Sequence, residues 1–366
     1  MRIALVALSC QNGGMLHYAT QLANALTGRC NLTWFTPPKS ELLDYLAPGV
    51  KVVPILPLSF PGHPVRSAWT QANPLRVGTI ALQIRLARPD VVHMVTDHPS
   101  NPLLLAFLGS VPGLFTHHDP SGHPGEGASW RSWLTHRTAR RCDRVVVHGE
   151  ALAAELATQG VDRGRIAVVP HGTYAFLRRH AAGRPEEPMI LCLGRLIRYK
   201  GLDVLCRAER LLAEWLRDYR LVIAGEGDAS WFKPEIGPSG RVQVIDRYLS
   251  DAEVAALVEA ARVVVLPYTQ ASQSGVLAIA QAFGKATVVT DVGGLPEGVG
   301  FGAAGVVVPA GDPAVLAEAI AGLWHDAPQR ARLGAAGRAI AETATSLDHI
   351  ATAHLDIYRQ TVEATA

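Results

Sequence analysis

The stretch from Val263 to Glu297 constrains the fold of this chain more than any other part of it. It runs VVVLPYTQASQSGVLAIAQAFGKATVVTDVGGLPE, so a β-branched run, a polar loop, an apolar helix pattern, a second β-branched run and a glycine pair follow without a gap. Short Val-rich runs are typical of parallel strands that are buried on both faces. The pattern predicts a strand–helix–strand unit of an open α/β sheet, with its helix over about residues 274–283.

The same stretch predicts an anion-binding site. Ser274 stands where a helix would begin, and a helix N-terminus directs unpaired backbone N–H groups at whatever lies beyond the sheet. Gly293 and Gly294 would allow the backbone to approach a ligand closely. Open α/β sheets hold phosphorylated ligands beyond the carboxyl ends of their strands, although any α/β domain contains units of this kind.

Two domains are expected, because 366 residues exceed the roughly 250–300 at which single cores stop growing. Strand and helix patterns alternate along most of the chain, which favours doubly wound parallel sheets. Polar residues interrupt this rhythm between His171 and Pro188. We place an acceptor-side domain at residues 1–175, a donor domain at 176–345 and a returning helix at 346–366.

Further elements of the expected domains can be located in the sequence. The segment from Ser59 to Asn73 is expected to be a Pro-containing loop, and the chain after Pro313 to be helical. Ser250 and Glu253 have the spacing of a capping box at the start of a helix. Strands of the first half are expected at Arg2–Leu8, Lys51–Ile55, Val91–Val95, Leu114–His117, Arg144–His148 and Ile166–Val169.

The composition narrows the class of partner. Lys and Arg number 34 against 32 Asp and Glu, so no global charge favours nucleic acid. The five cysteines are scattered, which indicates reduced thiols rather than disulfides or a metal site. No apolar run approaches the roughly 20 residues of a membrane span, and MRIALVALSC leads into QNGG without a cleavage site. We therefore expect a cytoplasmic protein.

A basic glycine loop, GRLIRYKG, follows the first predicted strand of the second half. It places Arg195 and Lys200 at the carboxyl end of a strand, with Gly201 at the start of the next helix. Two cations and a helix N-terminus together could hold a diphosphate. The alternative interpretation is a solvated basic loop, but another glycine turn, Gly225-Glu226-Gly227, ends a later strand of the same sheet.

The first half offers weaker signals. Gly13 and Gly14 follow the first predicted strand and form a second candidate cradle for phosphate or sugar, without the spacing of a dinucleotide fingerprint. His117, His118 and Asp119 end another strand; too few ligands surround them for metal, and His118 is the better candidate for a polar group in an interdomain cleft. Trp and Arg residues alternate in the segment Ser129–Arg144. This pattern is typical of a half-buried helix with a basic face, and the alternative is a surface that contacts a membrane or an acidic acceptor.

Taken in order, several motifs resemble those of the retaining nucleotide-sugar glycosyltransferases of family 4. They are THHD, VVPHGT, GRLIRYKGLDVL, IAGEGD, LSDAEVAALVEAARVVVLPY and QAFGKATVVTDVGGLPE. The resemblance spans nearly the whole chain and is specific in its second half. It implies the GT-B fold, in which two Rossmann-like domains face each other across a cleft and the C-terminal one holds most of the donor. It also implies transfer with retention, no metal ion and no cofactor besides the nucleotide-sugar co-substrate.

The resemblance assigns roles to individual residues. Arg195 and Lys200 would stabilise the departing diphosphate, and His118 would face the donor sugar. Where the family carries two glutamates, this chain has Gln273 and Gln281, which can hydrogen-bond hydroxyls but carry no charge. The residues that would bind the donor are Gly13, Gly14, Gly194, Glu226, Tyr248, Leu249, Gln273, Ser274, Gly275, Val276 and Gln281.

The expected function is transfer of a hexose from a UDP- or GDP-sugar to an acceptor hydroxyl. The acceptor could be a sugar, a lipid-linked sugar or a small molecule, with a peripheral contact to the inner face of a membrane as a further expectation. Two alternatives stay open. Because both glutamates are replaced, the chain could be a nucleotide-sugar-binding protein that has lost turnover. It could also be a nucleotide-sugar epimerase on the same fold, which would require carboxylates near the anomeric centre.

Overall fold

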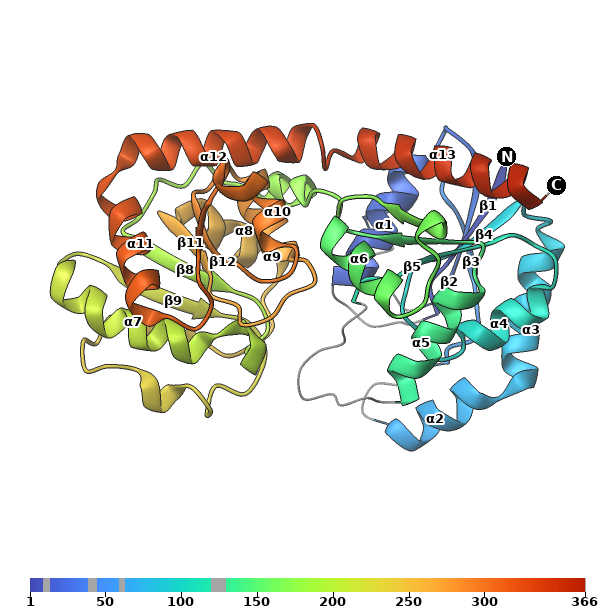
Figure 1. Ribbon diagram of the computed structural model, residues 1–366, viewed down its shortest axis with the longest axis horizontal. Helices are drawn as coiled ribbons and strands as arrows, with labels where there is room; N and C mark the ends of the chain where they lie inside the picture. The colour runs from blue at the N-terminus through green and yellow to red at the C-terminus, as the bar shows by residue number, and fades with distance from the viewer. Residues whose placement is uncertain (9–13, 39–44, 59–62, 120–129, 366) are drawn as a thin grey trace. The chain divides into compact units, whose positions relative to one another are not determined.

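The computed structural model describes residues 1–8, 14–38, 45–58, 63–119 and 130–365 (Figure 1). They form two compact units, one of Met1–Gly172 with Leu347–Ala366 and the other of Thr173–Ser346. The chain thus leaves the first unit after Gly172 and returns at Leu347, where the sequence analysis put domain limits at residues 175 and 345.

The first unit is built on a seven-stranded sheet in the order β3-β2-β1-β4-β5-β6-β7, in which every neighbouring pair is parallel. Its strands are β1 (Arg2–Val6), β2 (Asn31–Thr36), β3 (Lys51–Pro54), β4 (Val91–Met94), β5 (Gly113–Thr116), β6 (Arg144–Val147) and β7 (Ile166–Val168). Its helices are α1 (Gly14–Leu26), α2 (Pro64–Ala72), α3 (Pro74–Leu86), α4 (Asn101–Leu108), α5 (Trp130–Arg141), α6 (Glu150–Thr158) and α13 (Leu347–Thr365).

The side chains of β1 show how this sheet is covered. Because neighbouring side chains of a strand point to opposite faces, Ile3 and Leu5 join a cluster with α1 and α13, while Ala4 and Val6 join one with α3, α4 and α6. Both faces of the sheet are therefore buried, which explains why its strands are continuous runs of Val, Ile and Leu. The C-terminal helix α13 belongs to this unit and packs on α1.

The second unit has a six-stranded parallel sheet in the order β10-β9-β8-β11-β12-β13. Its strands are β8 (Met189–Leu193), β9 (Arg220–Ala224), β10 (Val242–Ile245), β11 (Val263–Leu266), β12 (Thr287–Thr290) and β13 (Val306–Val308). Its helices are α7 (Leu202–Trp215), α8 (Asp251–Ala260), α9 (Gly275–Ala282), α10 (Leu295–Gly298), α11 (Pro313–His325) and α12 (Ala327–Glu342).

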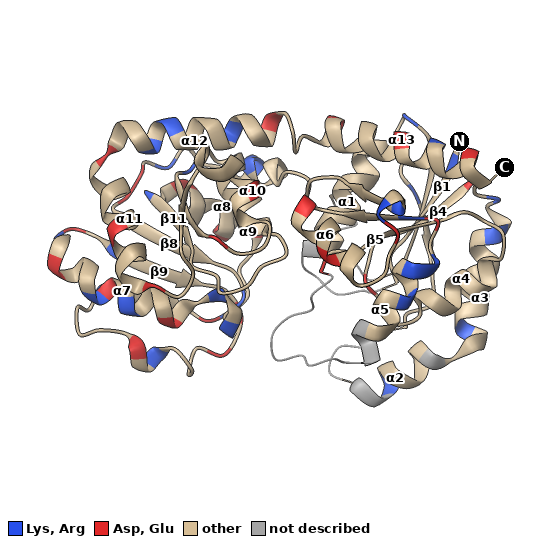
Figure 2. Cartoon of the chain, viewed as in Figure 1, with Lys and Arg blue, Asp and Glu red and all other residues tan. Residues whose placement is uncertain are grey.

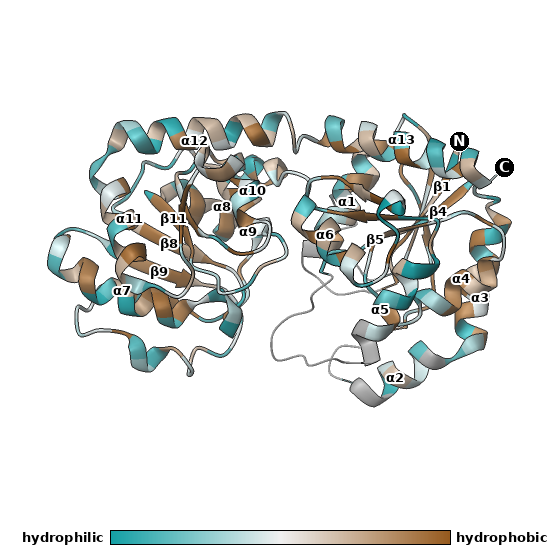
Figure 3. Cartoon of the chain, in the orientation of Figure 1, coloured by the Kyte–Doolittle hydropathy of each residue, from teal (hydrophilic) through white to brown (hydrophobic). Residues whose placement is uncertain are grey.

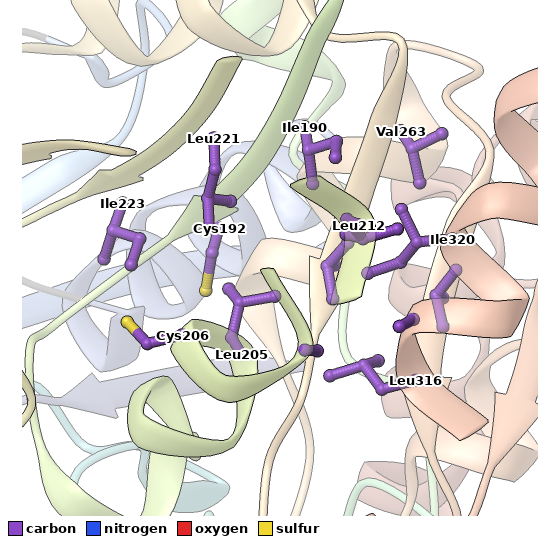
Figure 4. Close-up of a cluster of buried hydrophobic side chains, with 14 of the residues drawn as sticks. Ile190, Cys192, Leu205, Cys206, Leu212, Leu221, Ile223, Val263, Leu316 and Ile320 are labelled. Atoms are coloured by element: carbon purple, nitrogen blue, oxygen red, sulfur yellow. The ribbon is translucent and has the colours of Figure 1, made fainter. Parts of the chain in front are cut away.

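The core of the second unit again alternates along its central strand. Ile190 and Cys192 of β8 pack with apolar residues of α7 and α11 on one face, as Figure 4 shows for Leu205 and Leu316. Met189, Leu191 and Leu193 face α8 and α9 on the other. The chain reverses its direction across the sheet between β8 and β11, so the loops after these strands flank a topological switch point.

Several local predictions are confirmed. Helix α9 begins at Gly275 with Ser274 as its N-cap, and Ser250 and Glu253 form the predicted capping box of α8. The chain after Pro313 consists of α11, α12 and α13. Cys142, Cys192 and Cys206 are buried free thiols and Cys30 is half-buried, whereas Cys10 lies outside the described residues.

One prediction is wrong. Within the segment Ser59–Asn73, which was expected to be a loop, residues Pro64–Ala72 form helix α2. Pro64 stands in the first turn, where its missing N–H would have no partner in any case. Thr70 is buried and donates to the carbonyl of Leu58 at 2.7 Å, so tertiary contacts hold this short helix.

Candidate functional site

The loops that follow β8 and β9 touch each other through their backbones. Gly194 has a φ of 118°, and a Cβ atom on Gly225 would lie 2.2 Å from the carbonyl oxygen of Gly194. Further along, Leu196 and Gly227 form a parallel β-bridge, and the N–H of Leu196 donates to the carbonyl of Glu226 at 2.9 Å. Glycine is therefore required here because two backbones meet, which holds the basic loop in one conformation.

Lys200 lies among the loops at the switch point of the second sheet. Its Nζ atom is 3.7 Å from the ring centroid of Tyr268 and 5.3 Å from that of Tyr199. Burial, reinforced by the positive charge of Arg195, lowers the pKa of Lys200 to about 7. Among the described residues no carboxylate pairs with this ammonium group, so an anionic ligand would be the group that stabilises its charged form.

Arg195 is exposed and, within the described part of the chain, has no acidic partner either. Arg198, in the same loop, instead lies over the ring of Trp231 at 5.4 Å. Gly201 ends the loop with a φ of 63°, and a Cβ there would lie 1.9 Å from the carbonyl oxygen of Pro267. The loop after β8 and the loop after β11 are thus fixed against each other.

The N-terminus of α9 reaches the same place. A Cβ atom added to Gly194 would lie 3.4 Å from Cγ2 of Val276 and 3.8 Å from Nζ of Lys200. Ser274 caps the helix by accepting from the N–H of Leu277 at 3.3 Å, and its hydroxyl lies 3.2 Å from that of Tyr268. The first N–H groups of a helix have no acceptor within it, so a cationic side chain and helix N–H donors converge beside Gly194.

Gln273 and Gln281, which replace the family's glutamates, differ in environment. Oε1 of Gln273 is a buried acceptor without a partner among the described residues. Gln281 is 4% exposed, and its Nε2 donates to the carbonyl of Gly298 at 2.7 Å. An ionised glutamate at position 281 has no N–H to donate and could not make that bond. The hydrogen bond to Gly298 therefore explains why glutamine occupies this position.

The predicted glycine pair before α10 serves the protein's own packing. Gly293 has a φ of 53°, and a Cβ on it would lie 1.4 Å from the carbonyl oxygen of Ala271. The N–H of Gly294 donates to the carbonyl of Ser272 at 3.2 Å. The close approach that the sequence predicted for a ligand is therefore made to the loop that precedes α9.

The remaining predicted donor residues lie farther along the sheet edge or outside the second unit. Glu226 is exposed, Tyr248 is 56% exposed, and Leu249 is buried in the core cluster of α8 and α9. Gly14 is the first residue of α1, and Gly13 falls outside the described residues.

His118 is in the first unit, where it follows β5 and is only 4% exposed. Its Nε2 lies 3.0 Å from the carbonyl oxygen of Val95, and its Nδ1 lies 3.0 Å from Nε2 of His148. His117, its neighbour, lies 3.4 Å from a carboxylate oxygen of Asp97. The structure thus pairs His118 with a second histidine, His148.

The sequence analysis missed a group of buried rings around His118. Ring contacts connect it to Tyr18 and His148, and from there to His171 and His354. His148 and His171 stand at predicted strand ends of one sheet, which was a usable signal. Tyr18 and His354 come from α1 and α13, and no local pattern brings those helices together.

The described residues offer neither a metal-ligand cluster nor a helix suited to a bilayer. They contain no group of three or more His, Cys, Asp or Glu side chains placed to hold a metal ion. In the same part of the chain no helix combines the length and the hydrophobicity that crossing a bilayer requires.

Comparison with known families shows which family the chain belongs to. A family model described as Glycosyltransferase Family 4 matches residues 12–174, and one described as Glycosyl transferases group 1 matches residues 187–326. The chain belongs to glycosyltransferase family 4. The first match covers most of the seven-stranded unit, and the second covers most of the six-stranded one.

Curated relatives of this family-4 chain include several named D-inositol 3-phosphate glycosyltransferase. The one from Xylanimonas cellulosilytica is 33% identical over 248 residues, which is 60% of this chain and 58% of the relative. The one from Streptomyces avermitilis is 30% identical over 253 residues, or 63% of this chain and 52% of the relative. The chain spans about half the length of the curated relatives it matches.

Solved structures confirm the predicted GT-B fold. Anabaena Alr3699/HepE in complex with UDP has a TM-score of 0.77 at 19% identity, covering 98% of this chain and 100% of that one. Sucrose-phosphate synthase from Thermosynechococcus elongatus has a TM-score of 0.78 at 22% identity, covering 99% of both chains. At these identities the likeness concerns the fold.

Proposed function

We propose that this protein transfers a hexosyl group from a nucleoside diphosphate sugar to an acceptor hydroxyl, with retention at the anomeric carbon and without a metal ion. The observation that carries the proposal is the position of Lys200, a desolvated ammonium group without a carboxylate partner in the described chain, close to Gly194 and the first turn of α9. A diphosphate bound there would supply the missing negative charge.

Bond cleavage in this reaction leaves a further negative charge on the diphosphate. Lys200, Arg195 and the N-terminus of α9 would stabilise that charge as it develops, which is electrostatic catalysis. Two cations and a helix end take the part that a divalent ion plays elsewhere, and this supports the proposal of a metal-independent reaction. By family resemblance, His118 and Gly14 of the first unit would also bind the donor.

The names of similar proteins support a choice of substrates to test. One similar structure contains UDP and another UDP-glucose, and the curated relatives are named for D-inositol 3-phosphate. We therefore propose a UDP-sugar ahead of a GDP-sugar as donor. A sugar or small polyol is the first acceptor to test, and a lipid-linked sugar is the next.

The test compares Lys200→Met with Arg198→Ala, a matched change in the same loop whose guanidinium rests on Trp231. Calorimetry with UDP and GDP measures binding, and release of sugar from UDP-glucose with and without acceptor measures turnover. We expect Lys200→Met to weaken UDP binding at least tenfold and to lower kcat/KM by roughly 10²–10³, with Arg198→Ala near wild type.

Other outcomes would identify the alternatives. Binding without any turnover would favour a nucleotide-sugar-binding protein, and interconversion of free UDP-sugars without acceptor would favour an epimerase. If neither nucleotide binds the wild-type protein, the proposed donor site is wrong.

We further propose that helix α3 contacts an anionic membrane surface. Leu75, Leu82 and Leu86 share one face of the helix and are 81%, 58% and 73% exposed, while Val77 and Ile80 bury the opposite face. Figure 3 shows α3 and α4 as largely hydrophobic, and Figure 2 shows Lys or Arg but no Asp or Glu on α3. The stretch between Asp44 and Asp90 contains no acidic residue, whereas it contains Lys51 and four arginines. An apolar face among cations is suited to anionic lipid.

A further inference from the structure

Three histidines gather at the carboxyl edge of the first sheet. His118 follows β5, His148 follows β6, and His171 comes shortly after β7. His118 and His148 are 4% and 8% exposed, and their ring centroids are 4.9 Å apart. Their hydrogen bonds determine where the protons must be.

The outer nitrogen of each ring has a fixed role. Nε2 of His118 lies 3.0 Å from the carbonyl oxygen of Val95, and Nδ1 of His148 lies 3.0 Å from that of Val169. A carbonyl oxygen only accepts hydrogen bonds, so both outer nitrogens carry a proton. In a neutral imidazole the other nitrogen is then bare.

The two inner nitrogens face each other. Nδ1 of His118 and Nε2 of His148 are 3.0 Å apart, a hydrogen-bond distance. Two bare nitrogens would oppose lone pair to lone pair, whereas one added proton makes the contact a charge-assisted hydrogen bond. We propose that His118 and His148 share one extra proton at neutral pH, and that His148 is a positioning residue which sets the tautomer and charge of His118.

The neighbouring histidines do not need such a proton. Nδ1 of His354 lies 2.8 Å from the carbonyl oxygen of Ile350, which leaves Nε2 to accept from the hydroxyl of Tyr18 at 3.0 Å. His93 lies between the hydroxyls of Thr116 and Tyr358, each 2.7 Å away, and hydroxyls can serve either role. Both are satisfied as neutral rings, so neither competes with the pair for the extra proton.

The surroundings act on the extra proton in both directions. Burial lowers the pKa of both rings and so opposes the proton, and the charge of His117 acts in the same direction on His118 as that of His118 does on His148. Asp97 and the carbonyl of Val95 act in the opposite direction on His118, as the carbonyl of Val169 does on His148. Titratable groups facing the pair or its immediate neighbours are Tyr18, His93, Asp97, His117, His171, His354 and, against His171, His17.

The shared proton has a consequence that rests on the proposed function. If His118 faces the donor sugar, as family resemblance implies, the pair presents one positive charge to an anionic donor and holds the His118 ring in one orientation. Loss of the proton at alkaline pH would then lower turnover, and removal of His148 would abolish that part of the pH dependence.

The first test needs no donor and therefore stands apart from the proposed function. Histidine-selective ¹⁵N labelling with long-range ¹⁵N–¹H correlation shows which ring nitrogens carry protons. At pH 7 we expect both outer nitrogens to be protonated and both inner ones to resonate between bare and protonated positions. Two inner nitrogens at the bare position would overturn the proposal.

The second test uses variants of the full chain. His148→Gln keeps an N–H donor for Nδ1 of His118 without the charge, His148→Leu removes both, and His354→Gln is a control in the same cluster. We expect kcat to fall about tenfold in His148→Gln and further in His148→Leu, with little change in KM, and the alkaline limb of the pH profile to be lost. If His148→Gln keeps the alkaline limb, or if His354→Gln loses it, His148 has no such role.

Discussion

The environment of Lys200 favours the binding of an anionic ligand, because no acidic side chain among the described residues pairs with it. Its ammonium group lies over an aromatic ring, and burial lowers its pKa to about 7. Gln281 shows the opposite case, a polar group whose needs the protein itself meets through the carbonyl of Gly298. Each environment leads to a prediction at the scale of the residue.

The affinity for UDP should depend on pH through Lys200. Above pH 7 the free protein holds this amine mostly neutral, and binding must take up a proton, so affinity falls as pH rises. We expect Kd for UDP to rise roughly 20-fold between pH 7.5 and 9, as measured by calorimetry in buffers of different ionisation enthalpy.

Lys200→Arg provides the control for that dependence. Its guanidinium stays charged throughout this range, so the variant should bind UDP less well in absolute terms but without the rise. An unchanged pH dependence in Lys200→Arg would assign the effect to another group.

Gln281→Glu should destabilise the second unit. The carboxylate would lose the donor to Gly298 and place a negative charge against a carbonyl oxygen, which costs about 2–4 kcal/mol. Protonation restores a donor, so the loss in unfolding free energy should be smaller at pH 4 than at pH 7. Urea unfolding measures both, with the half-buried Gln273→Glu as the matched change; equal losses in the two variants would contradict the argument.

At the scale of elements, short segments are held by what they pack against. Helix α2 forms around buried Ser67 and Thr70 although its sequence suggested a loop, and the glycine loops after β8 and β9 keep their shape through backbone contacts. Helix α3 is the exception, because one of its faces is covered by the sheet and the other exposes three leucines.

Replacing Leu82 and Leu86 by glutamine should weaken binding of the protein to vesicles of phosphatidylglycerol and phosphatidylcholine, while leaving UDP affinity unchanged. We expect at least a tenfold loss in co-sedimentation, because each leucine contributes about 1–2 kcal/mol of transfer free energy. Trp215→Gln, an exposed apolar residue of α7, is the control. Two outcomes would rule out the membrane contact. One is vesicle binding that the substitutions do not change, and the other is a concentration-dependent dimer that the substitutions abolish.

At the scale of the whole molecule, the two units differ in what they bury. The second unit has two cations that pair with no described acidic residue, Arg195 and Lys200, in a loop at the edge of its sheet. The first unit instead encloses four histidines between its sheet and the helices α1 and α13, namely His93, His118, His148 and His354. Because α13 follows the second unit in the sequence and yet completes this cluster, folding of the first unit depends on a segment from beyond the second.

The first unit should therefore lose stability in acid. Burial lowers the pKa of His171 and of His354 to about 4, so below pH 6.5 the unfolded chain binds more protons than the folded one. Each should cost about 2 kcal/mol of unfolding free energy between pH 7 and 5, measurable in urea by the signal of the first unit. His354→Gln should remove only its own share of the loss, about 2 kcal/mol, because other buried histidines of this unit also have lowered pKa values. An unchanged slope would show that other groups cause the whole loss.

Most strands, most helix starts and the glycine loops at the sheet edge could be predicted from the sequence, because these depend on signals within a few residues. Val-rich runs, the Ser274 cap and the basic loop after β8 needed no distant partner to be recognised. The environments of Lys200, Gln281 and His118 could not be predicted and became visible only in the folded chain. That Lys200 lies on Tyr268, that Gln281 bonds Gly298 and that His118 pairs with His148 depend on residues 17–68 positions apart. Such contacts form when strands and helices pack, and no local pattern encodes them.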